Sequence, residues 1–173
     1  MTQKILLIRH AIAEERSSRA GAHRDSERAL TPEGVQKFKE AARGLRVFCP
    51  QIQSIVSSPY LRAWQTAEIL KTAYEDSELL SDERLVCGVG VREYLALIGE
   101  HASGSGVLAI VAHEPDLGIV FSHLLSRSLD GGGHFFSFKK GGVAFLEFYG
   151  AIAEGAATLH WAMPPKALRA AAN

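Results

Sequence analysis

The sequence predicts an α/β fold, a three-layer α/β/α sandwich around a mostly parallel central sheet. Two short, largely apolar runs at 4–8 and 107–112 contain several β-branched residues and no polar alternation, which is typical of strands covered on both faces. Amphipathic helical patterns separate the candidate strands. Strands that alternate with helices favour parallel pairing through right-handed crossovers.

Three further segments are candidate strands. Residues 52–57 form a weaker third strand, residues 143–149 a fourth that could lie nearer a sheet edge, and residues 158–162 one more. In a sheet of this kind, a ligand site is expected beyond the carboxyl ends of the central strands.

The first helix is expected to begin at Thr31-Pro32-Glu33. Thr31 can cap it, Pro32 suits the first helical position, and Glu33 favours the positive helix end. Further helices are expected from 58, over 91–98 and from about 115. Apolar residues at helical spacing mark the first, second and last of these helices: Val35, Phe38, Ala42 and Leu45; Leu61, Trp64 and Ala67; Leu117, Val120, Phe121 and Leu124.

The length of 173 residues suits one domain, because a chain of this size buries roughly 70% of its unfolded surface. No repeat or linker divides the chain, so a single domain over 1–173 is expected. Polar, glycine-containing segments at 14–28 and 131–133 are expected to be loops. The alanine-rich end, 167–173, is expected to be a frayed tail.

The charge balance excludes several functions. Lys plus Arg and Asp plus Glu are both 19, so the formal net charge is zero and no broad basic field could hold a nucleic acid.

The apolar runs are far shorter than the roughly 20 residues that span a bilayer, and no signal-peptide pattern opens the chain. A cytoplasmic protein is therefore expected. Cys49 and Cys87 are too few for a disulfide framework or a four-cysteine zinc site and are expected to be buried or idle thiols.

Residues suited to a phosphate follow three of the predicted strands. Arg9 and His10 follow the first, Arg62 lies shortly after 52–57, and His113 follows the central run. Because the carboxyl ends of parallel strands meet at one sheet edge, one dianion could contact them all. The arginine fork matches phosphate oxygens, and Arg62 in the first turn of its helix would add charge to a positive helix end.

His10 in such a ring can act as a nucleophile. Its neutral ring can attack phosphorus while Arg9, Arg62 and a protonated His113 offset the charge on the equatorial oxygens. The two histidines would then have opposite protonation states, because cations disfavour the charged form and a bound anion favours it. The sequence therefore predicts a phosphatase without metal or cofactor. The other histidines are expected to be structural: His23, His101, His123, His134 and His160.

Four motifs, in this order along the chain, resemble the histidine phosphatase superfamily, and more closely its short SixA-type phosphohistidine phosphatase branch. Residues 7–11 resemble the nucleophile motif, 25–31 the segment that leads into the first helix, 57–67 the second arginine motif, and 111–115 the second histidine motif.

The resemblance implies a role for each pocket residue. His10 is the nucleophile that becomes phosphorylated, Arg9 and Arg62 clamp the phosphate, and His113 is the second pocket histidine. Within 25–31, Asp25 and Arg28 are expected to form a structural pair.

Two positions depart from the family pattern. Ala11 stands where the wider superfamily usually has glycine, which adds a methyl group and restricts the backbone beside the phosphate. Cys87 lies near the position where many larger relatives carry a glutamate general acid. Glu83 or Glu14 could substitute, although each is more typical of a solvated surface charge.

Other functions fit the sequence less well. A zinc hydrolase could use His10, His113 and Glu114, but no HExxH helix occurs and two arginines would repel the cation. A serine hydrolase is not indicated, because the sequence contains no Gly-x-Ser-x-Gly elbow. A dinucleotide-binding turn follows a strand and begins a helix, whereas the glycines at 104–106 precede a strand. A phosphoglycerate-mutase-like transferase stays a minor alternative. A phosphoprotein-binding module would not require His10.

The pocket residues specify a phosphoryl group and leave its carrier open. The candidates are phosphohistidine on a signalling or carrier protein and small phosphorylated molecules. The apparent lack of a general acid favours phosphohistidine, because an alkoxide needs a proton to depart whereas imidazole leaves as a neutral base. The sequence indicates no oligomeric state.

Overall fold

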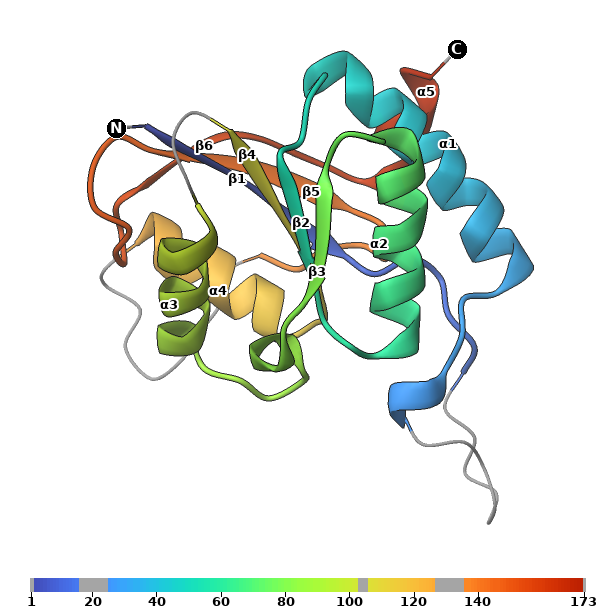
Figure 1. The fold of residues 1–173 in the computed structure, drawn as a ribbon, viewed down its shortest axis with the longest axis horizontal. Coiled ribbons are helices and arrows are strands. Elements are labelled where there is room, and N and C mark those ends of the chain that lie inside the picture. Colours follow the sequence, from blue (N-terminus) through green and yellow to red (C-terminus); the bar gives the residue numbers. More distant parts are fainter. Residues whose placement is uncertain (1, 16–24, 103–105, 127–135, 173) are drawn as a thin grey trace.

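A computed structural model describes residues 2–15, 25–102, 106–126 and 136–172. Six strands form one sheet in the order β3-β2-β4-β1-β5-β6 (Figure 1). The strands are β1 (Gln3–Arg9), β2 (Ser54–Ser57), β3 (Glu78–Ser81), β4 (Val107–Ala112), β5 (Val143–Phe148) and β6 (Ala157–Met163). The pairs β3-β2, β2-β4 and β4-β1 are parallel, whereas β5 is antiparallel to β1 and to β6. The mostly parallel sheet is confirmed.

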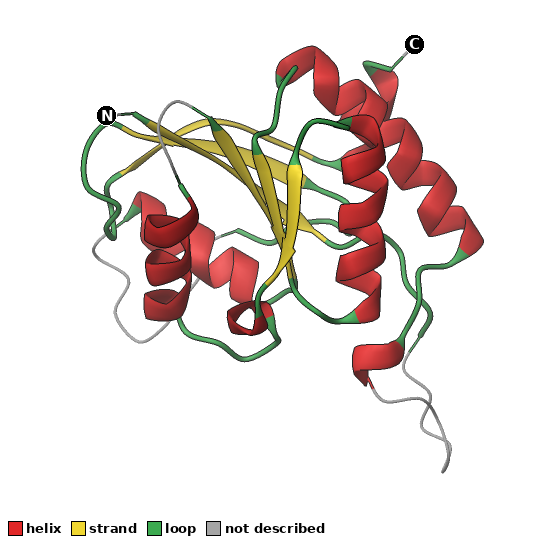
Figure 2. Ribbon diagram, in the orientation of Figure 1, coloured by secondary structure: helices red, strands yellow, loops and turns green. Residues whose placement is uncertain are grey.

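Helices cover both faces of this sheet (Figures 1 and 2). One face carries α1 (Pro32–Phe48), α2 (Leu61–Ala73) and α5 (Pro165–Ala170), and the other carries α3 (Val91–His101) and α4 (Asp116–Leu125). Two short 3-10 helices, η1 (Asp25–Glu27) and η2 (Glu83–Leu85), lie in the connections. The predicted three-layer α/β/α sandwich is confirmed. None of these helices is long and apolar enough to cross a membrane.

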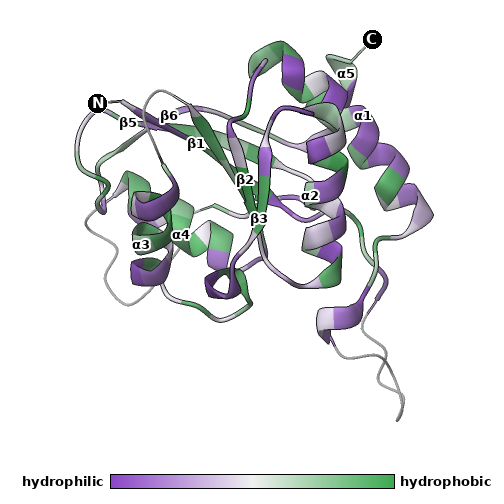
Figure 3. Cartoon of the chain, in the orientation of Figure 1, coloured by the Kyte–Doolittle hydropathy of each residue, from purple (hydrophilic) through white to green (hydrophobic). Residues whose placement is uncertain are grey.

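The central strands are apolar on both sides because both sides are covered. In β1, Leu6 and Ile8 pack in the core under α1 and α2, while Ile5 and Leu7 pack in the core under α3 and α4. All four side chains are fully buried, and each such burial stabilises the fold by roughly 1.5–3 kcal/mol. The hydropathy colours in Figure 3 show the same apolar character along β4.

Helix α1 begins as the sequence predicts. The Thr31 side chain accepts a hydrogen bond from the Gly34 N–H at 3.0 Å, and Pro32 is the first helical residue. A Cβ atom on Gly34 would lie 2.0 Å from the Ile12 carbonyl oxygen. Glycine at this position therefore lets the segment after β1 pass directly over the helix.

The expected frayed tail is wrong over residues 165–170, which form helix α5. Leu168 is fully buried in the core beside α1. A Cβ atom on Gly44 of α1 would lie 1.7 Å from the Leu168 carbonyl oxygen, so the two segments pack backbone to backbone. Packing of Leu168 against the core stabilises this helix, and the alanine-rich sequence does not indicate that contact.

Two other differences concern strands and helix ends. Strand β3 was not predicted, and α3 extends to His101 instead of ending at 98. The loops expected at 131–133, at 104–105 and over most of 14–28 lie outside the described residues, as do His23 and His134.

Candidate active site

The carboxyl ends of β1, β2 and β4 lie side by side, because β4 pairs with both of the other strands. The His10 N–H donates to the Ala112 carbonyl and the Ser58 N–H to the Val111 carbonyl, both at 3.0 Å. These bonds bring the residues after the three strands to one edge of the sheet. The side chains of His10, Arg62 and His113 are all buried, with exposed fractions of 6%, 2% and 1%.

His10 is held as a neutral tautomer. Its Nε2 lies 3.3 Å from the Nε–H of Arg62, which can only donate, so Nε2 carries a lone pair. Its Nδ1 then donates to the Ala11 carbonyl at 2.7 Å. Burial, followed by the charges of Arg62, Arg9 and Arg28, lowers the pKa of His10 to about 3, although the Ala11 carbonyl opposes this shift. His10 is therefore uncharged at neutral pH.

Every nitrogen of the Arg62 guanidinium is engaged. Besides the contact with His10, Nη1 donates to the Asp25 carbonyl at 2.6 Å. Nη2 donates to the Asp25 carboxylate at 3.1 Å and lies 3.7 Å from the Cys87 sulfur. The guanidinium carbon also lies 5.2 Å from the centre of the Tyr60 ring. These contacts fix the fork in the first turn of α2, with its Nε edge toward His10.

Arg9 approaches from the end of β1. Its Nη1 donates to the Phe138 carbonyl at 2.5 Å, and its Nε is buried without a hydrogen-bond partner among the described residues. Burial lowers the pKa of Arg9, the Glu114 carboxylate opposes this shift, and Arg62 adds to it.

His113 completes the cluster. Its ring centre lies 5.2 Å from that of His10 and 5.1 Å from that of Tyr60, and its Nε2 lies 2.8 Å from the Ser58 hydroxyl. Its Nδ1 is buried and has no partner within the described part of the chain. Burial, then Arg62, lowers the pKa of His113 to about 3. Burial and the neighbouring cations thus keep both histidines neutral by lowering their pKa values, and the opposite protonation states expected from the sequence require an anion beside His113.

Comparisons with known proteins show the family to which this chain belongs. The model of the histidine phosphatase superfamily, branch 1, matches residues 5–86. An uncharacterized protein of Picosynechococcus sp. is 32% identical over 153 residues, which cover 83% of this chain and 84% of that protein. The putative phosphohistidine phosphatase SixA from Nakamurella multipartitia superposes with a TM-score of 0.77 at 26% identity, over 95% of this chain and 97% of that chain. The chain belongs to the histidine phosphatase superfamily.

Two further SixA structures share the fold. The putative enzyme from Agrobacterium tumefaciens has a TM-score of 0.75 at 21% identity, over 94% of this chain and 98% of that chain. A SixA structure complexed with tungstate has a TM-score of 0.74 at 23% identity, over 95% of this chain and 99% of that chain. The protein is a SixA-type histidine phosphatase, an enzyme whose mechanism uses a histidine.

The sequence missed several residues that shape the site of this histidine phosphatase. Thr66 accepts a hydrogen bond from the Ala11 N–H at 3.0 Å and donates to the Arg62 carbonyl at 2.6 Å, so it ties the nucleophile motif to α2. Ser58 and Tyr60 contact His113 as described above. All three residues lie within the motif at 57–67, and their small polar or aromatic character next to an arginine was the available signal.

The predicted pair of Asp25 and Arg28 is present, with 2.9 Å between carboxylate and guanidinium. The same carboxylate also pairs with Arg62, which the sequence did not reveal. Ala11 causes no backbone strain, because no described residue other than glycine has a positive φ angle.

The positions considered for a general acid differ in their surroundings. Cys87 lies at the outer edge of Arg62, as noted above, and is partly buried. Glu83, at the start of η2, and Glu14 are both exposed. Cys49 is buried far from this edge, beside Tyr74, whose hydroxyl donates to the Cys49 carbonyl at 2.7 Å.

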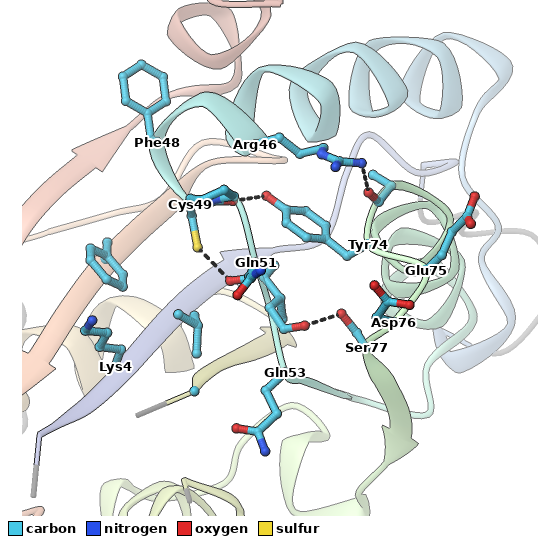
Figure 4. A pocket seen from close by; sticks show the side chains of 16 residues that line it. Lys4, Arg46, Phe48, Cys49, Gln51, Gln53, Tyr74, Glu75, Asp76 and Ser77 are labelled. Atoms are coloured by element: carbon cyan, nitrogen blue, oxygen red, sulfur yellow. Dashed lines mark hydrogen bonds between the residues drawn. The ribbon is translucent and has the colours of Figure 1, made fainter. Parts of the chain in front are cut away.

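A cavity of about 820 Å³ lies elsewhere, at the amino ends of the strands (Figure 4). Lys4, Cys49, Gln53 and Tyr74 are among its lining residues. None of the clustered histidines and arginines of the histidine phosphatase site lines it, so this cavity is separate from the chemistry. Within the described ranges, no three His, Cys, Asp or Glu side chains are grouped to hold a metal ion.

Proposed function

We propose that this enzyme removes the phosphoryl group from phosphohistidine on a signalling or carrier protein, with His10 as the nucleophile. The observation that carries the proposal is the tautomer of His10. A buried, neutral imidazole presents the lone pair of Nε2 toward Arg62, at the edge where three strand ends converge. This is the form of histidine that can attack phosphorus.

In the first step, the phosphoryl group lies between Arg9, Arg62 and His113. We assign the binding of the equatorial oxygens to the Nε–H groups of both arginines and to the Nδ1 of His113. Two of these atoms, the Nε of Arg9 and the Nδ1 of His113, are buried without another partner in the described residues, which supports the assignment. The Nε2 lone pair forms a bond to phosphorus while the phosphorus–nitrogen bond of the substrate breaks, and its electron pair stays on the departing imidazole. The hydrogen bond from Nδ1 to the Ala11 carbonyl stabilises the positive charge that His10 acquires.

In the second step, water attacks phosphorus, and the electron pair of the broken bond returns to His10 Nε2. The proton of the water passes to solvent, and inorganic phosphate leaves. No cofactor takes part in either step of this scheme. The residues involved come from the ends of β1, β2 and β4, which supports one functional domain for the whole chain.

His113 is the group whose charge we expect to change. A dianion beside its Nδ1 favours the imidazolium and raises its pKa from the low value set by burial and Arg62. The protonated ring then donates to a phosphoryl oxygen. Before the substrate enters, His10 keeps its lone pair because burial disfavours the charged ring and because its Nε2 faces the guanidinium of Arg62.

The substrate class follows from the leaving group. A thiol, Cys87, lies beside the outer edge of Arg62, and a thiol is a weak general acid for an alkoxide near neutral pH. Imidazole can depart without such an acid. The likeness to the putative phosphohistidine phosphatase SixA of Nakamurella multipartitia supports the same substrate class.

Two measurements test the proposal. Enzyme quenched in alkali after brief exposure to substrate should carry an acid-labile, base-stable phosphate on a peptide that contains His10. Catalytic efficiency should be high on a phosphohistidine protein, intermediate on an aryl phosphate and low on a sugar phosphate. Full activity of His10→Ala would exclude the nucleophile, and comparable turnover of the sugar phosphate would instead favour a small-molecule phosphoesterase.

A further inference from the structure

The backbone of Phe138 is held between two charged side chains. Its carbonyl accepts from Arg9 Nη1 at 2.5 Å, and its N–H donates to the Glu114 Oε1 at 2.5 Å. The other carboxylate oxygen of Glu114 accepts from the Gly118 N–H at 3.2 Å, in the first turns of α4. Glu114, on the connection between β4 and α4, thus reaches the same residue that orients Arg9.

The segment that contains Phe138 also forms hydrogen bonds with the backbone of Arg9 and His10. The Gly141 N–H lies 3.1 Å from the Arg9 carbonyl and 3.0 Å from the His10 carbonyl, and the Arg9 N–H donates to Gly142 at 3.1 Å. The Phe138 ring is buried and packs edge-on against Phe121 of α4, with ring centres 5.5 Å apart. This segment therefore cannot shift independently, and its movement would also move Arg9.

Gly118 makes the approach of Glu114 possible. A Cβ atom at this position would lie 2.4 Å from the Phe136 carbonyl oxygen and 2.9 Å from the Glu114 Oε2. Both distances are shorter than real contacts allow. The first turns of α4 are thus shaped to admit the carboxylate and the segment it holds.

We infer that Glu114 is a positioning residue that orients Arg9 through the backbone of Phe138. The inference rests on the proposed function, in which Arg9 clamps the phosphoryl group. Without the carboxylate, the Phe138 N–H loses its acceptor. The carbonyl of the same residue can then turn away from Arg9 Nη1. The guanidinium then keeps its charge but loses its fixed direction, and its Nε no longer points at a defined oxygen position.

A double-mutant cycle between Glu114 and Arg9 tests this coupling. The dissociation constant of inorganic phosphate and kcat/KM on an aryl phosphate are measured for the wild type, Glu114→Ala, Arg9→Ala and the double variant. We expect Glu114→Ala to weaken both by about 10-fold in the wild type and by less than about 2-fold in the Arg9→Ala background, because residues that act as a unit are not additive. Equal losses in both backgrounds would overturn the inference.

Two further variants separate positioning from stability. Glu114→Gln keeps an oxygen that can accept from the Phe138 N–H, so it should recover much of the phosphate affinity lost in Glu114→Ala. It also serves if Glu114→Ala does not fold. Glu147→Gln is the matched control, because Glu147 is a buried carboxylate that accepts from Tyr149 at 2.8 Å, and its partner in the sheet, Lys4, lies at the start of β1. It should leave phosphate affinity unchanged.

Phosphate binding is measured without turnover, so the two proposals can fail separately. A non-additive binding cycle together with a missing His10 phosphoenzyme would remove the proposed function and keep the positioning role. A His10 phosphoenzyme together with an additive cycle would keep the proposed function and exclude the positioning role of Glu114.

Discussion

The Nε–H of Arg62 lies 3.3 Å from the Nε2 of His10, so a permanent cation faces the atom that carries the lone pair. Burial, followed by this arrangement, lowers the pKa of His10 and keeps that nitrogen from binding a proton. It also means that the contact must open when a phosphoryl group enters, and the same N–H is then free to bind a phosphoryl oxygen. In the proposed mechanism, one guanidinium can therefore keep His10 neutral before the reaction and stabilise the charge that develops during it.

Removal of the Arg62 fork should lower kcat strongly. We expect Arg62→Ala to lose about 100-fold to 1000-fold in kcat on an aryl phosphate, since it deletes a buried donor aimed at the transferring group. Arg62→Lys restores the charge but not the fork held by Asp25 and should recover only a small part. Steady-state kinetics give both constants. An unchanged kcat with a raised KM would reduce Arg62 to ground-state binding.

Chelation should leave turnover unchanged. The phosphoryl charge is offset by Arg9, Arg62 and His113, so no divalent cation is needed in the proposed steps. Enzyme dialysed for a long period against EDTA should keep the kcat of the untreated enzyme. Loss of activity, restored by one equivalent of a divalent ion, would favour the zinc hydrolase.

Stability should fall as the pH is lowered below neutrality. The pKa values of His10 and His113 are about 3 in the folded protein, against an ordinary value of 6.5. Between these values the unfolded chain binds protons that the folded protein does not, so the free energy of unfolding decreases by up to about 1.4 kcal/mol per pH unit for each histidine. The contribution is fully present above the unfolded pKa and lost progressively toward the folded pKa.

Urea unfolding at several pH values between about 7.5 and 5 measures this slope. His113→Asn should reduce the slope of the free energy of unfolding against pH by up to about 1.4 kcal/mol per pH unit, which corresponds to one proton. The exposed His160 provides the comparison, because His160→Asn removes a histidine outside the pocket. An equal effect of the two substitutions would mean that the pocket histidines are not the source of the slope.

The terminal helix should contribute to the stability of the whole domain. Leu168→Ala removes a fully buried side chain next to α1 and is expected to lower the free energy of unfolding by about 2–5 kcal/mol. Lys166→Ala, on the exposed side of the same helix, should change it by less than about 0.5 kcal/mol. Chemical denaturation compares the two variants. Equal stability of both would indicate that α5 does not support the core.

The sequence predicted the central strands and the first helix because local signals agreed with the tertiary structure. The apolar run in β1 is buried on both sides, and Thr31 caps α1 as its residue type suggests. Strand β3 was not predicted because only Leu79 and Leu80 are apolar, and they are flanked by the charged Glu78 and the polar Ser81. An edge strand of this length depends on its partner β2 rather than on its own pattern.

The charged residues of the candidate site were predicted, but the contacts that hold them were not. Strand ends and residue types sufficed to bring His10, Arg62 and His113 together. The contact of Asp25 with Arg62 was missed because it joins residues 37 positions apart, from segments whose relative position only the fold determines. The burial of Leu168 against α1 was missed for the same reason.

The order of the strands also bears on how the enzyme is synthesised. Strands β1 and β2 are made first, yet they do not pair with each other and are joined in the sheet only through β4, which lies between them. A chain emerging from the ribosome therefore carries Arg9, His10 and Arg62 without the sheet that aligns them, and His113 follows only after β4. In the proposed mechanism, the catalytic residues are thus brought together only late in biosynthesis, and a truncated product that ends before β4 would contain His10 without the residues that surround it.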